Sequence, residues 1–295
     1  MHLLPNDGDM RVFEIPCQIA EQSANALGDY GAKGNFLREG FATQLGLPIM
    51  RSWTGKVTVG SGKQVETVGT TVVPFRFREE KTVHILKFHI LPDCIHDVIV
   101  GKQFLKITQT FSNLTNYARR VKERMVKGIS QFRFLYLGAS TSMVSGSVNG
   151  QPHTALADSG SKVLVMNEAY ARDIGVNIET GRHLRRKVIF ADNSVAETIG
   201  MAYDVEWRFG YDDSFSSPYQ LDFHILQDAP VDVILSDTFL FDNEVFSRYQ
   251  DCFTDDDEDY EDEDKETYFF AIDFDKRREP LTGTTPHTKE NAFMF

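Results

Sequence analysis

The residues best suited to chemistry lie in one short stretch of this 295-residue chain. There an apolar segment ends at Asp158, and Ser159 and Gly160 follow before a second apolar segment begins. A carboxylate can exchange protons with a reacting group, a hydroxyl can brace a loop, and glycine permits backbone that a Cβ would crowd. Because short polar turns of this composition are common, the motif alone does not define a site.

The motif gains meaning because the chain repeats it. Asp29, Tyr30 and Gly31 lie 129 positions before Asp158, Ser159 and Gly160, and the ungapped alignment of 26–49 with 155–178 holds 9 identities in 24 positions. Two further blocks recur in the same order with an offset of 135, namely 88–91 with 223–226 and 97–101 with 232–236. Matched blocks in one order predict two copies of one domain. One chain therefore supplies two such carboxylates.

The elements that must position these residues read mostly as strands. In each copy an apolar strand leads to the aspartate, a short helix follows, and a hairpin lies in the middle of the domain. The first hairpin has the glycine-rich tip Gly60-Ser61-Gly62, and the second turns at Asp192 and Asn193. The pattern predicts a mostly β fold with short helices.

Length and charge divide the chain further. A hydrophobic fraction of 41% and 23 phenylalanines suffice for the cores of about two ordinary domains. Residues 251–295 hold 15 acidic and 5 basic side chains, so they carry −10 of the net charge of −12. The acidic run 255–264 buries too little apolar surface to offset its ordering entropy, which predicts a largely disordered tail.

Composition also excludes several classes of protein. Cys17, Cys94 and Cys252 have no metal-binding spacing and are odd in number, so we expect free thiols, no metal and no cofactor. No signal-peptide pattern and no apolar run of about 20 residues occurs, which favours a cytoplasmic or otherwise intracellular protein without membrane contact. The near-neutral folded part lacks a basic stripe, so no nucleic-acid partner is expected.

Each copy resembles a retropepsin-like aspartic peptidase domain, the small β-barrel type of retroviruses and retroelements. The resemblance rests on the strand ending in Asp-x-Gly, the short helix, the flap hairpin and a closing apolar segment before a helix with Phe-Leu. It covers about residues 12–106 and 140–250. It implies that Asp158 and Asp29 are the catalytic residues. It further implies active-site loops formed by Ser159, Gly160, Tyr30 and Gly31, and flaps formed by Gly60, Ser61, Gly62, Asp192 and Asn193.

The resemblance also implies an architecture. Two acid-protease barrel lobes would form a pseudo-dimer, with a peptide or protein bound in the cleft between them. We expect a first, degenerate lobe at 10–106, a connector with a short helix at 107–139, a second lobe at 140–250 and the acidic tail at 251–295. The function implied is that of an aspartic endopeptidase, in which two carboxylates sharing a proton activate water.

Two departures leave other interpretations open. Tyr30 stands where the family has Thr or Ser, and Ser236 stands where the first copy has Gly101. The chain can therefore also be an inactive protein- or peptide-binding module derived from a retroelement. In a third arrangement, the second copy pairs with its counterpart in another molecule. We expect a monomer, with a dimer through the second lobe as the alternative.

Overall fold

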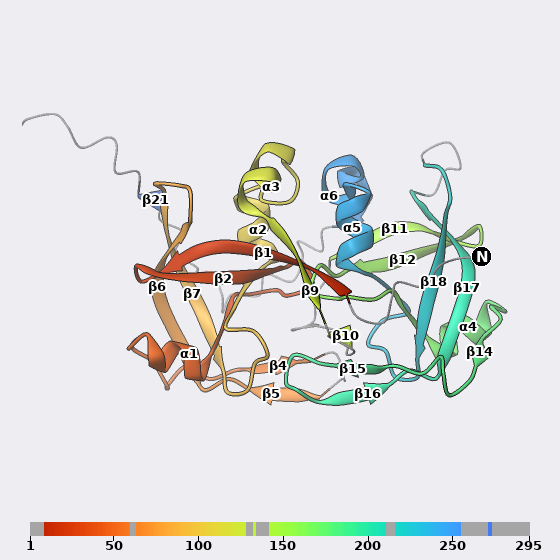
Figure 1. Ribbon diagram of the computed structural model, residues 1–295, viewed down its shortest axis with the longest axis horizontal. Helices are drawn as coiled ribbons and strands as arrows, with labels where there is room; N and C mark the ends of the chain where they lie inside the picture. Colours follow the sequence, from red (N-terminus) through yellow and green to blue (C-terminus); the bar gives the residue numbers. More distant parts are fainter. Residues whose placement is uncertain are drawn as a thin grey trace, which may run out of the picture.

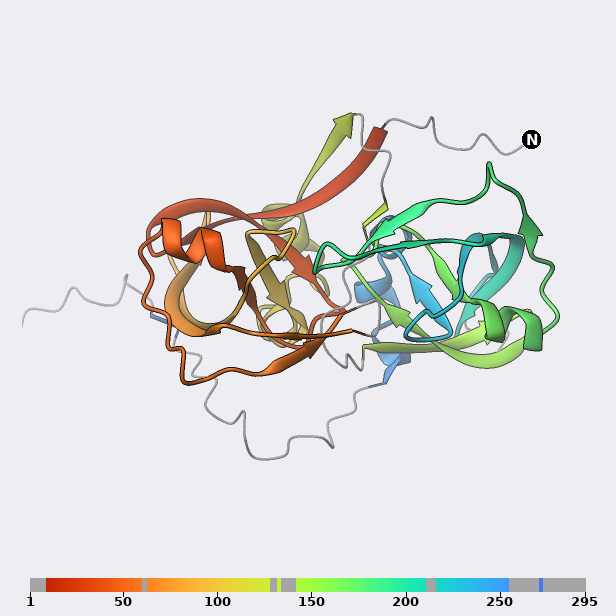
Figure 2. The ribbon, with the colours of Figure 1, turned by 90° about the horizontal axis from the view of Figure 1, so that it is seen from below.

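The computed structural model describes residues 9–59, 63–127, 132–133, 142–210, 216–254 and 271–272. The predicted flap residues Gly60, Ser61 and Gly62 and most of the acidic tail lie outside these ranges. Two β-rich lobes lie side by side, with helices of both lobes near the centre of one side and the flap hairpins on the opposite side (Figures 1 and 2).

The first lobe is a sheet that closes on itself. Its strands follow the order β2-β8-β3-β7-β6-β1, and β1 also pairs with β2. Burial alternates along β6, as expected for a strand with one face on the core, whereas all four residues of β8 are buried. The strand bounds are β1 (Asp9–Ile19), β2 (Gln22–Asp29), β3 (Phe36–Arg38), β6 (Gly69–Phe77), β7 (Val83–Leu91) and β8 (Val98–Gly101).

The second lobe repeats this pairing. Its order β12-β19-β13-β18-β17-β11 closes through a β11–β12 pair, and the parallel pairs β2–β8 and β3–β7 recur as β12–β19 and β13–β18. The predicted mostly β fold with two barrel-like lobes is confirmed. The strand bounds are β11 (Met143–Val148), β12 (Gln151–Ala157), β13 (Val165–Asn167), β14 (Glu179–Thr180), β17 (Gly200–Phe209), β18 (Tyr219–Leu226) and β19 (Val233–Leu235).

Short helices and hairpins complete each lobe. The first flap hairpin is β4 (Lys56–Thr58) with β5 (Gln64–Glu66), and the second is β15 (Lys187–Ile189) with β16 (Val195–Glu197). None of the helices in the described ranges is long and apolar enough to cross a membrane. The helices are α1 (Glu39–Gln44), α2 (Lys102–Ile107), α3 (Leu114–Arg120), α4 (Glu168–Asp173), α5 (Asp237–Asp242), α6 (Val245–Arg248) and the 3-10 helix η1 (Gln250–Cys252).

The predicted connector, residues 107–139, belongs largely to the first lobe. The short helix expected in this segment is α3, which ends at Arg120, and β9 (Lys122–Lys127) follows as a strand that pairs with β1. The extended backbone gains a ladder of main-chain hydrogen bonds there, which outweighs helix propensity. Within the remainder, β10 (Phe132–Arg133) is described and pairs in parallel with flap strand β15, while 128–131 and 134–139 lie outside the described residues.

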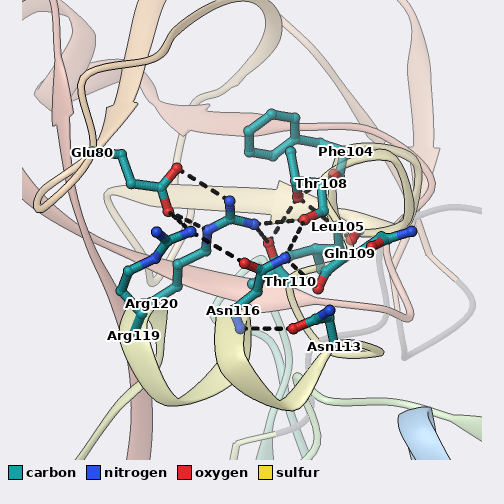
Figure 3. Close-up of polar contacts among 10 residues, drawn as sticks. All are labelled: Glu80, Phe104, Leu105, Thr108, Gln109, Thr110, Asn113, Asn116, Arg119 and Arg120. Atoms are coloured by element: carbon teal, nitrogen blue, oxygen red, sulfur yellow. Dashed lines mark hydrogen bonds and ion pairs between the residues drawn. The ribbon is translucent and has the colours of Figure 1, made fainter.

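Polar contacts of Arg120, the last residue of α3, fix this helix to the first lobe (Figure 3). The buried Arg120 guanidinium donates to both carboxylate oxygens of Glu80, at 2.6 and 3.1 Å, and to the carbonyl oxygen of Thr108 at 2.6 Å. It also lies 4.1 Å from the ring centroid of Phe77. Since each of the three guanidinium nitrogens donates a hydrogen bond and Glu80 balances the charge, this arginine can be buried without an unpaired charge.

The second lobe extends beyond its predicted end at residue 250. Strand β20 (Phe253–Thr254) pairs with β11, and the Phe253 ring stacks on Phe246 at 5.7 Å between centroids. Phe253 thus completes a hydrophobic contact, which places the lobe boundary after Thr254. A second part of the tail, β21 (Ala271–Ile272), pairs with the edge of β7 in the first lobe.

Aromatic rings join the two lobes. Phe13 lies 4.7 Å from Phe241, and Phe111 lies 5.0 Å from Phe241 and 5.1 Å from Phe246, as centroid distances. Such pairs contribute about 0.5–1.5 kcal/mol each beyond their buried area. We call the following set the interlobe aromatic cluster: Phe13, Tyr30, Phe111 and Tyr117 from the first lobe, and Phe241, Phe246 and Phe253 from the second.

Candidate active site

The two aspartates lie at equivalent strand ends. Asp29 is the last residue of β2 and pairs with Gly101 of the parallel strand β8. Asp158 directly follows β12, and its N–H donates to the carbonyl oxygen of Leu235 at the end of β19, at 3.1 Å. Both side chains are fully buried. The parallel pairing in each lobe therefore delivers one carboxylate to the boundary between the lobes.

The structure brings these carboxylates together. The Oδ2 atoms of Asp29 and Asp158 are both buried without a hydrogen-bond partner among the described residues. A Cβ added to Gly31 would lie 2.9 Å from Oδ1 of Asp158 and 3.1 Å from Oδ1 of Asp29. Glycine is required at this position because any larger residue would collide with the carboxylate of the other lobe.

Main-chain donors hold both carboxylates in place, and they do so unequally. Oδ1 of Asp29 accepts from the N–H groups of Gly31, at 2.8 Å, and Ala32, at 3.2 Å. Oδ1 of Asp158 accepts from Gly160 N–H at 2.8 Å. Because hydrogen bonds to a carboxylate stabilise its charged form, the first-lobe loop favours ionisation more than the second.

The pKa values of this pair follow from the same surroundings. Burial raises the pKa of Asp29, and its main-chain donors oppose that rise. Burial also raises the pKa of Asp158, and the nearby charge of Asp29 raises it further. Two buried carboxyl groups so close together cannot both ionise readily, so the pair retains a proton at pH values where isolated carboxyl groups have lost theirs.

Ser159 ties the loop of the second lobe to that of the first. Its hydroxyl donates to the carbonyl oxygen of Gly28 and accepts from the N–H of Tyr30, both at 2.8 Å. Ser142, also from the second lobe, donates to the carbonyl oxygen of Tyr30 at 2.5 Å. The backbone of the Asp-Tyr-Gly loop is therefore held on both sides of Tyr30 by second-lobe hydroxyls.

The Tyr30 side chain belongs to the interlobe aromatic cluster. Its ring centroid lies 4.7 Å from that of Phe246 and 5.8 Å from that of Phe253. The residue that departs from the family pattern thus contributes to lobe pairing through its ring, whereas Ser159 contributes through its hydroxyl.

The second flap reaches across to the first lobe. The Asn193 side chain donates to the carbonyl oxygen of Asp93 at 2.8 Å, and Ile95 N–H donates to the carbonyl oxygen of Ala191 at 3.2 Å. Asp192 lies 3.4 Å from the ammonium group of Lys63 in the first flap. Burial raises the pKa of Asp192, but its hydrogen bonds from Ser194 and its contact with Lys63 outweigh burial and hold the pKa below the usual value.

Three contributors to this site escaped the sequence analysis. Ser142 lies in no recognisable sequence motif, and nothing in the sequence of residues 93–95 indicates that this loop contacts a flap. Lys162, which lies in the Asp158 loop, forms a buried ion pair with Asp237 and donates to the carbonyl oxygen of Arg11 at 3.3 Å. The position of Lys162 directly before the apolar residues 163–166 was the feature of the sequence that could have indicated its burial. Across the residues with assigned positions, no group of three or more His, Cys, Asp or Glu side chains is placed to hold a metal ion.

One family model matches the first lobe of this chain. Residues 15–104 match the family model described as aspartyl protease. One similar solved structure is the retroviral protease-like domain of Ddi1 from Leishmania major, at 20% identity and a TM-score of 0.27, covering 35% of this chain and 82% of that one. No curated protein matches the chain. The family match thus covers the first lobe, and the second lobe repeats the strand pairing of the first.

Proposed function

We propose that this chain is an aspartic endopeptidase whose two lobes supply one catalytic carboxylate each, from Asp29 and Asp158. The observation that carries the proposal is the pair of fully buried carboxyl groups that meet at Gly31 and have raised pKa values. Paired carboxyl groups whose surroundings push their protonation apart are suited to acid–base catalysis.

The unequal surroundings suggest distinct roles. Asp29, with two main-chain donors on one oxygen, is the ionised partner and acts as the general base on a water molecule. Asp158, whose pKa is raised by burial and by Asp29, keeps the proton and donates it toward the carbonyl oxygen of the scissile amide. Attack gives a gem-diol. As its C–N bond breaks, Asp29 passes its proton to the leaving nitrogen and one gem-diol hydroxyl returns a proton to Asp158, which restores the pair to its starting state.

Substrate entry requires movement of the flaps. Both carboxyl groups are fully buried, and the second flap is bonded to the first lobe through Asn193 and Ala191. The flap sheet also accepts an extended strand, since β10 pairs with the outer edge of β15. These observations support a cleft that opens, takes an extended peptide and excludes water on closing.

The proposal is tested by substituting each aspartate separately. Asp29→Asn and Asp158→Asn keep side-chain size but remove one acid–base partner, so each should lower cleavage of an unstructured protein by at least about 100-fold. Cleavage is measured by mass spectrometry between pH 4 and 7, and circular dichroism controls for folding. A dead Asp158→Asn with an unaffected Asp29→Asn would replace the intramolecular pair with pairing between chains.

A peptide-binding module is the second candidate. The observation that favours it is the closed state of the site, in which the second flap bonds to the first lobe above fully buried carboxyl groups. Absence of cleavage by the parent at every pH between 4 and 7, together with saturable binding of unstructured peptides, would select this function.

We further propose that the functional unit is a monomer. The interlobe aromatic cluster and the ion pair of Arg11 with Asp242, at 2.8 Å, support pairing of lobes within one chain. Sedimentation at micromolar concentration should give the mass of one chain. A dimer that persists in a chain limited to the second lobe would favour the intermolecular arrangement.

A further inference from the structure

Two buried clusters flank the carboxyl pair, one in each lobe, and their members correspond. The first cluster contains Leu27 and Ala32 from the strand and loop around Asp29, and the second contains Leu156 from the strand before Asp158. With the offsets of the sequence repeat, the remaining walls match as Phe36 with Val165, Leu91 with Leu226, Cys94 with Ala229, and Ile99 with Ile234.

Each flap contributes a buried side chain to the cluster of its own lobe at the position just before its turn, while Val188 also belongs to the second cluster and Ala191 to the first. Val59 in the first flap and Phe190 in the second occupy the same hairpin position, because each N–H donates at 2.9 Å across the turn, to Lys63 and Ser194 respectively. The strand registers agree, with Val57 opposite Val65 and Val188 opposite Ala196. Both side chains are 1% exposed.

The lobes differ in which element carries the aromatic ring. In the first lobe it is Phe36 of the barrel strand β3, whose ring lies 5.7 Å from that of His89. In the second lobe the barrel position holds Val165, and the ring is Phe190 on the flap. The first cluster therefore has a fixed aromatic wall under a small flap residue, while the second has a small wall under a large flap residue.

Space remains in the first cluster as a result. A cavity of about 90 Å³ lies beneath the first flap; apolar side chains, among them Val59, Leu91 and Ala191, form most of its wall, and the charged residues Lys63, Asp93 and Asp192 also line it. Because its exposed wall is mostly apolar, the cavity suits an aliphatic group better than water. In the second cluster the ring of Phe190 packs against the wall residues themselves.

We propose that Phe190 determines the size of the second-lobe subsite, so that the cleft takes a large apolar side chain against the first lobe and a small one against the second. This inference rests on the proposed peptidase function, and it defines the substrate class as extended peptides with one large and one small residue beside the cleaved bond. Phe190 acts on selectivity and is not placed in the acid–base chemistry.

The experiment compares Phe190→Val, which copies Val59, with the parent chain. A peptide series carries Ala, Leu or Phe at each of the two positions beside the cleaved bond, and kcat/KM is measured for each peptide. The parent should require the small residue on one side only. Phe190→Val should raise kcat/KM for peptides with Phe on that side by about 10-fold or more, since a pocket gains room for several methylene equivalents.

Two variants serve as controls. Val59→Phe should exclude large residues from the other side of the bond, which moves selectivity in the opposite sense. Val195→Ala changes an exposed residue of the same flap, 57% accessible, and should leave the size preferences of the parent unchanged. Equal size preferences at both positions in the parent, or an unaltered preference in Phe190→Val, would overturn the inference while leaving the peptidase proposal intact.

A binding measurement separates the two proposals further. The same peptides with the scissile amide reduced to an amine cannot be cleaved, and their binding is followed by fluorescence anisotropy. If the parent cleaves nothing, the peptidase proposal fails, and the size order of binding then decides the role of Phe190. A parent that neither cleaves nor binds these peptides overturns both.

Discussion

The hydroxyl of Ser159 accepts a hydrogen bond from the main-chain N–H of Tyr30 at 2.8 Å, which links the active-site loops of the two lobes. The same hydroxyl donates to the carbonyl oxygen of Gly28. One side chain of the second lobe thus satisfies a donor and an acceptor in the first. Because both main-chain groups lie beside buried Asp29, their positions affect how closely the carboxyl groups approach.

Replacing Ser159 tests this link. Ser159→Ala leaves the Tyr30 N–H and the Gly28 carbonyl without their partner, which costs about 1–3 kcal/mol for a buried polar group. We expect a lower midpoint in urea unfolding and a reduced kcat with little change in KM. Ser159→Thr keeps the hydroxyl and should retain parental values of both. Equal behaviour of the two variants would show that the hydroxyl does not brace the loops.

Restoring the family residue at position 30 should weaken the protein. Tyr30→Thr adds a hydroxyl but removes the ring that contacts Phe246 and Phe253. Loss of a large packed side chain costs about 2–4 kcal/mol. Thermal unfolding should report this loss, whereas Tyr30→Phe should stay within about 1 kcal/mol of the parent. A stabilised Tyr30→Thr would mean that the loops gain more from the hydroxyl than the lobes lose from the ring.

Stability should depend on pH in a direction set by the buried carboxyl pair. The pKa values of Asp29 and Asp158 are raised in the folded chain, so their contribution is fully present below the unfolded carboxyl pKa of about 4 and is lost as pH rises through the folded values. Asp158→Asn removes one ionisable group, so its free energy of unfolding relative to the parent should increase between pH 4 and 8. Urea titrations across this range measure the difference.

Asp192 offers a control of opposite sign. Its pKa is lowered in the folded chain, so its contribution is present above the unfolded pKa and is lost as pH falls through the folded value. Asp192→Asn should therefore lose stability relative to the parent as pH rises from about 3 to 5. Parallel pH curves for both variants and the parent would contradict the origin assigned to these shifts.

The buried ion pair of Arg120 and Glu80 should be one of the larger single contributions to the first lobe. Arg120→Ala leaves Glu80, 10% exposed, without this partner, and breaking a buried pair costs about 3–5 kcal/mol. Arg119 also contacts Glu80 but is 44% exposed, so Arg119→Ala should cost less than about 1 kcal/mol. Chemical denaturation of both variants measures the contrast. Equal losses would show that burial does not distinguish the two arginines.

The position at which the tail is removed should matter. A chain ending at Thr254 keeps β20 and the Phe253 ring, while a chain ending at Gln250 loses both. The shorter chain should be less stable by about 1–3 kcal/mol, because it loses the half-buried Phe253 and the buried Cys252. Differential scanning calorimetry of the two chains provides the comparison. Equal transitions would return the lobe boundary to residue 250.

Local patterns in the sequence were enough to predict the fold class, because the repeat with its strand-Asp-x-Gly and hairpin signals is written in neighbouring residues. The end of α3 at Arg120 was not predictable in that way, since it depends on the pairing of β9 with β1 more than 100 positions earlier. The placement of the Tyr30 ring depends likewise on Phe246 and Phe253 in the other lobe. Both features depend on tertiary contacts, so the sequence immediately around Arg120 or Tyr30 is not enough to predict them.

The same limit applies to the candidate site. The repeat identified Asp29 and Asp158 as a pair of interest, and the structure brings them into contact. Ser142 and the pairing of Lys162 with Asp237 stayed hidden, because a serine at a strand start and a lysine in an apolar stretch are compatible with many surroundings. The roles of Ser142 and Lys162 follow from their contacts in the folded chain and not from their residue types.

The interlobe aromatic cluster has a consequence for genetics. In an enzyme assembled from two identical subunits, a chain with a defective aspartate can join a normal one and disable the mixed pair. Here Phe13 and Phe241 join lobes that are synthesised together. If the chain is the monomeric peptidase proposed above, a cell with one altered and one normal gene copy should keep about half of its molecules fully active, and such mutations should be recessive.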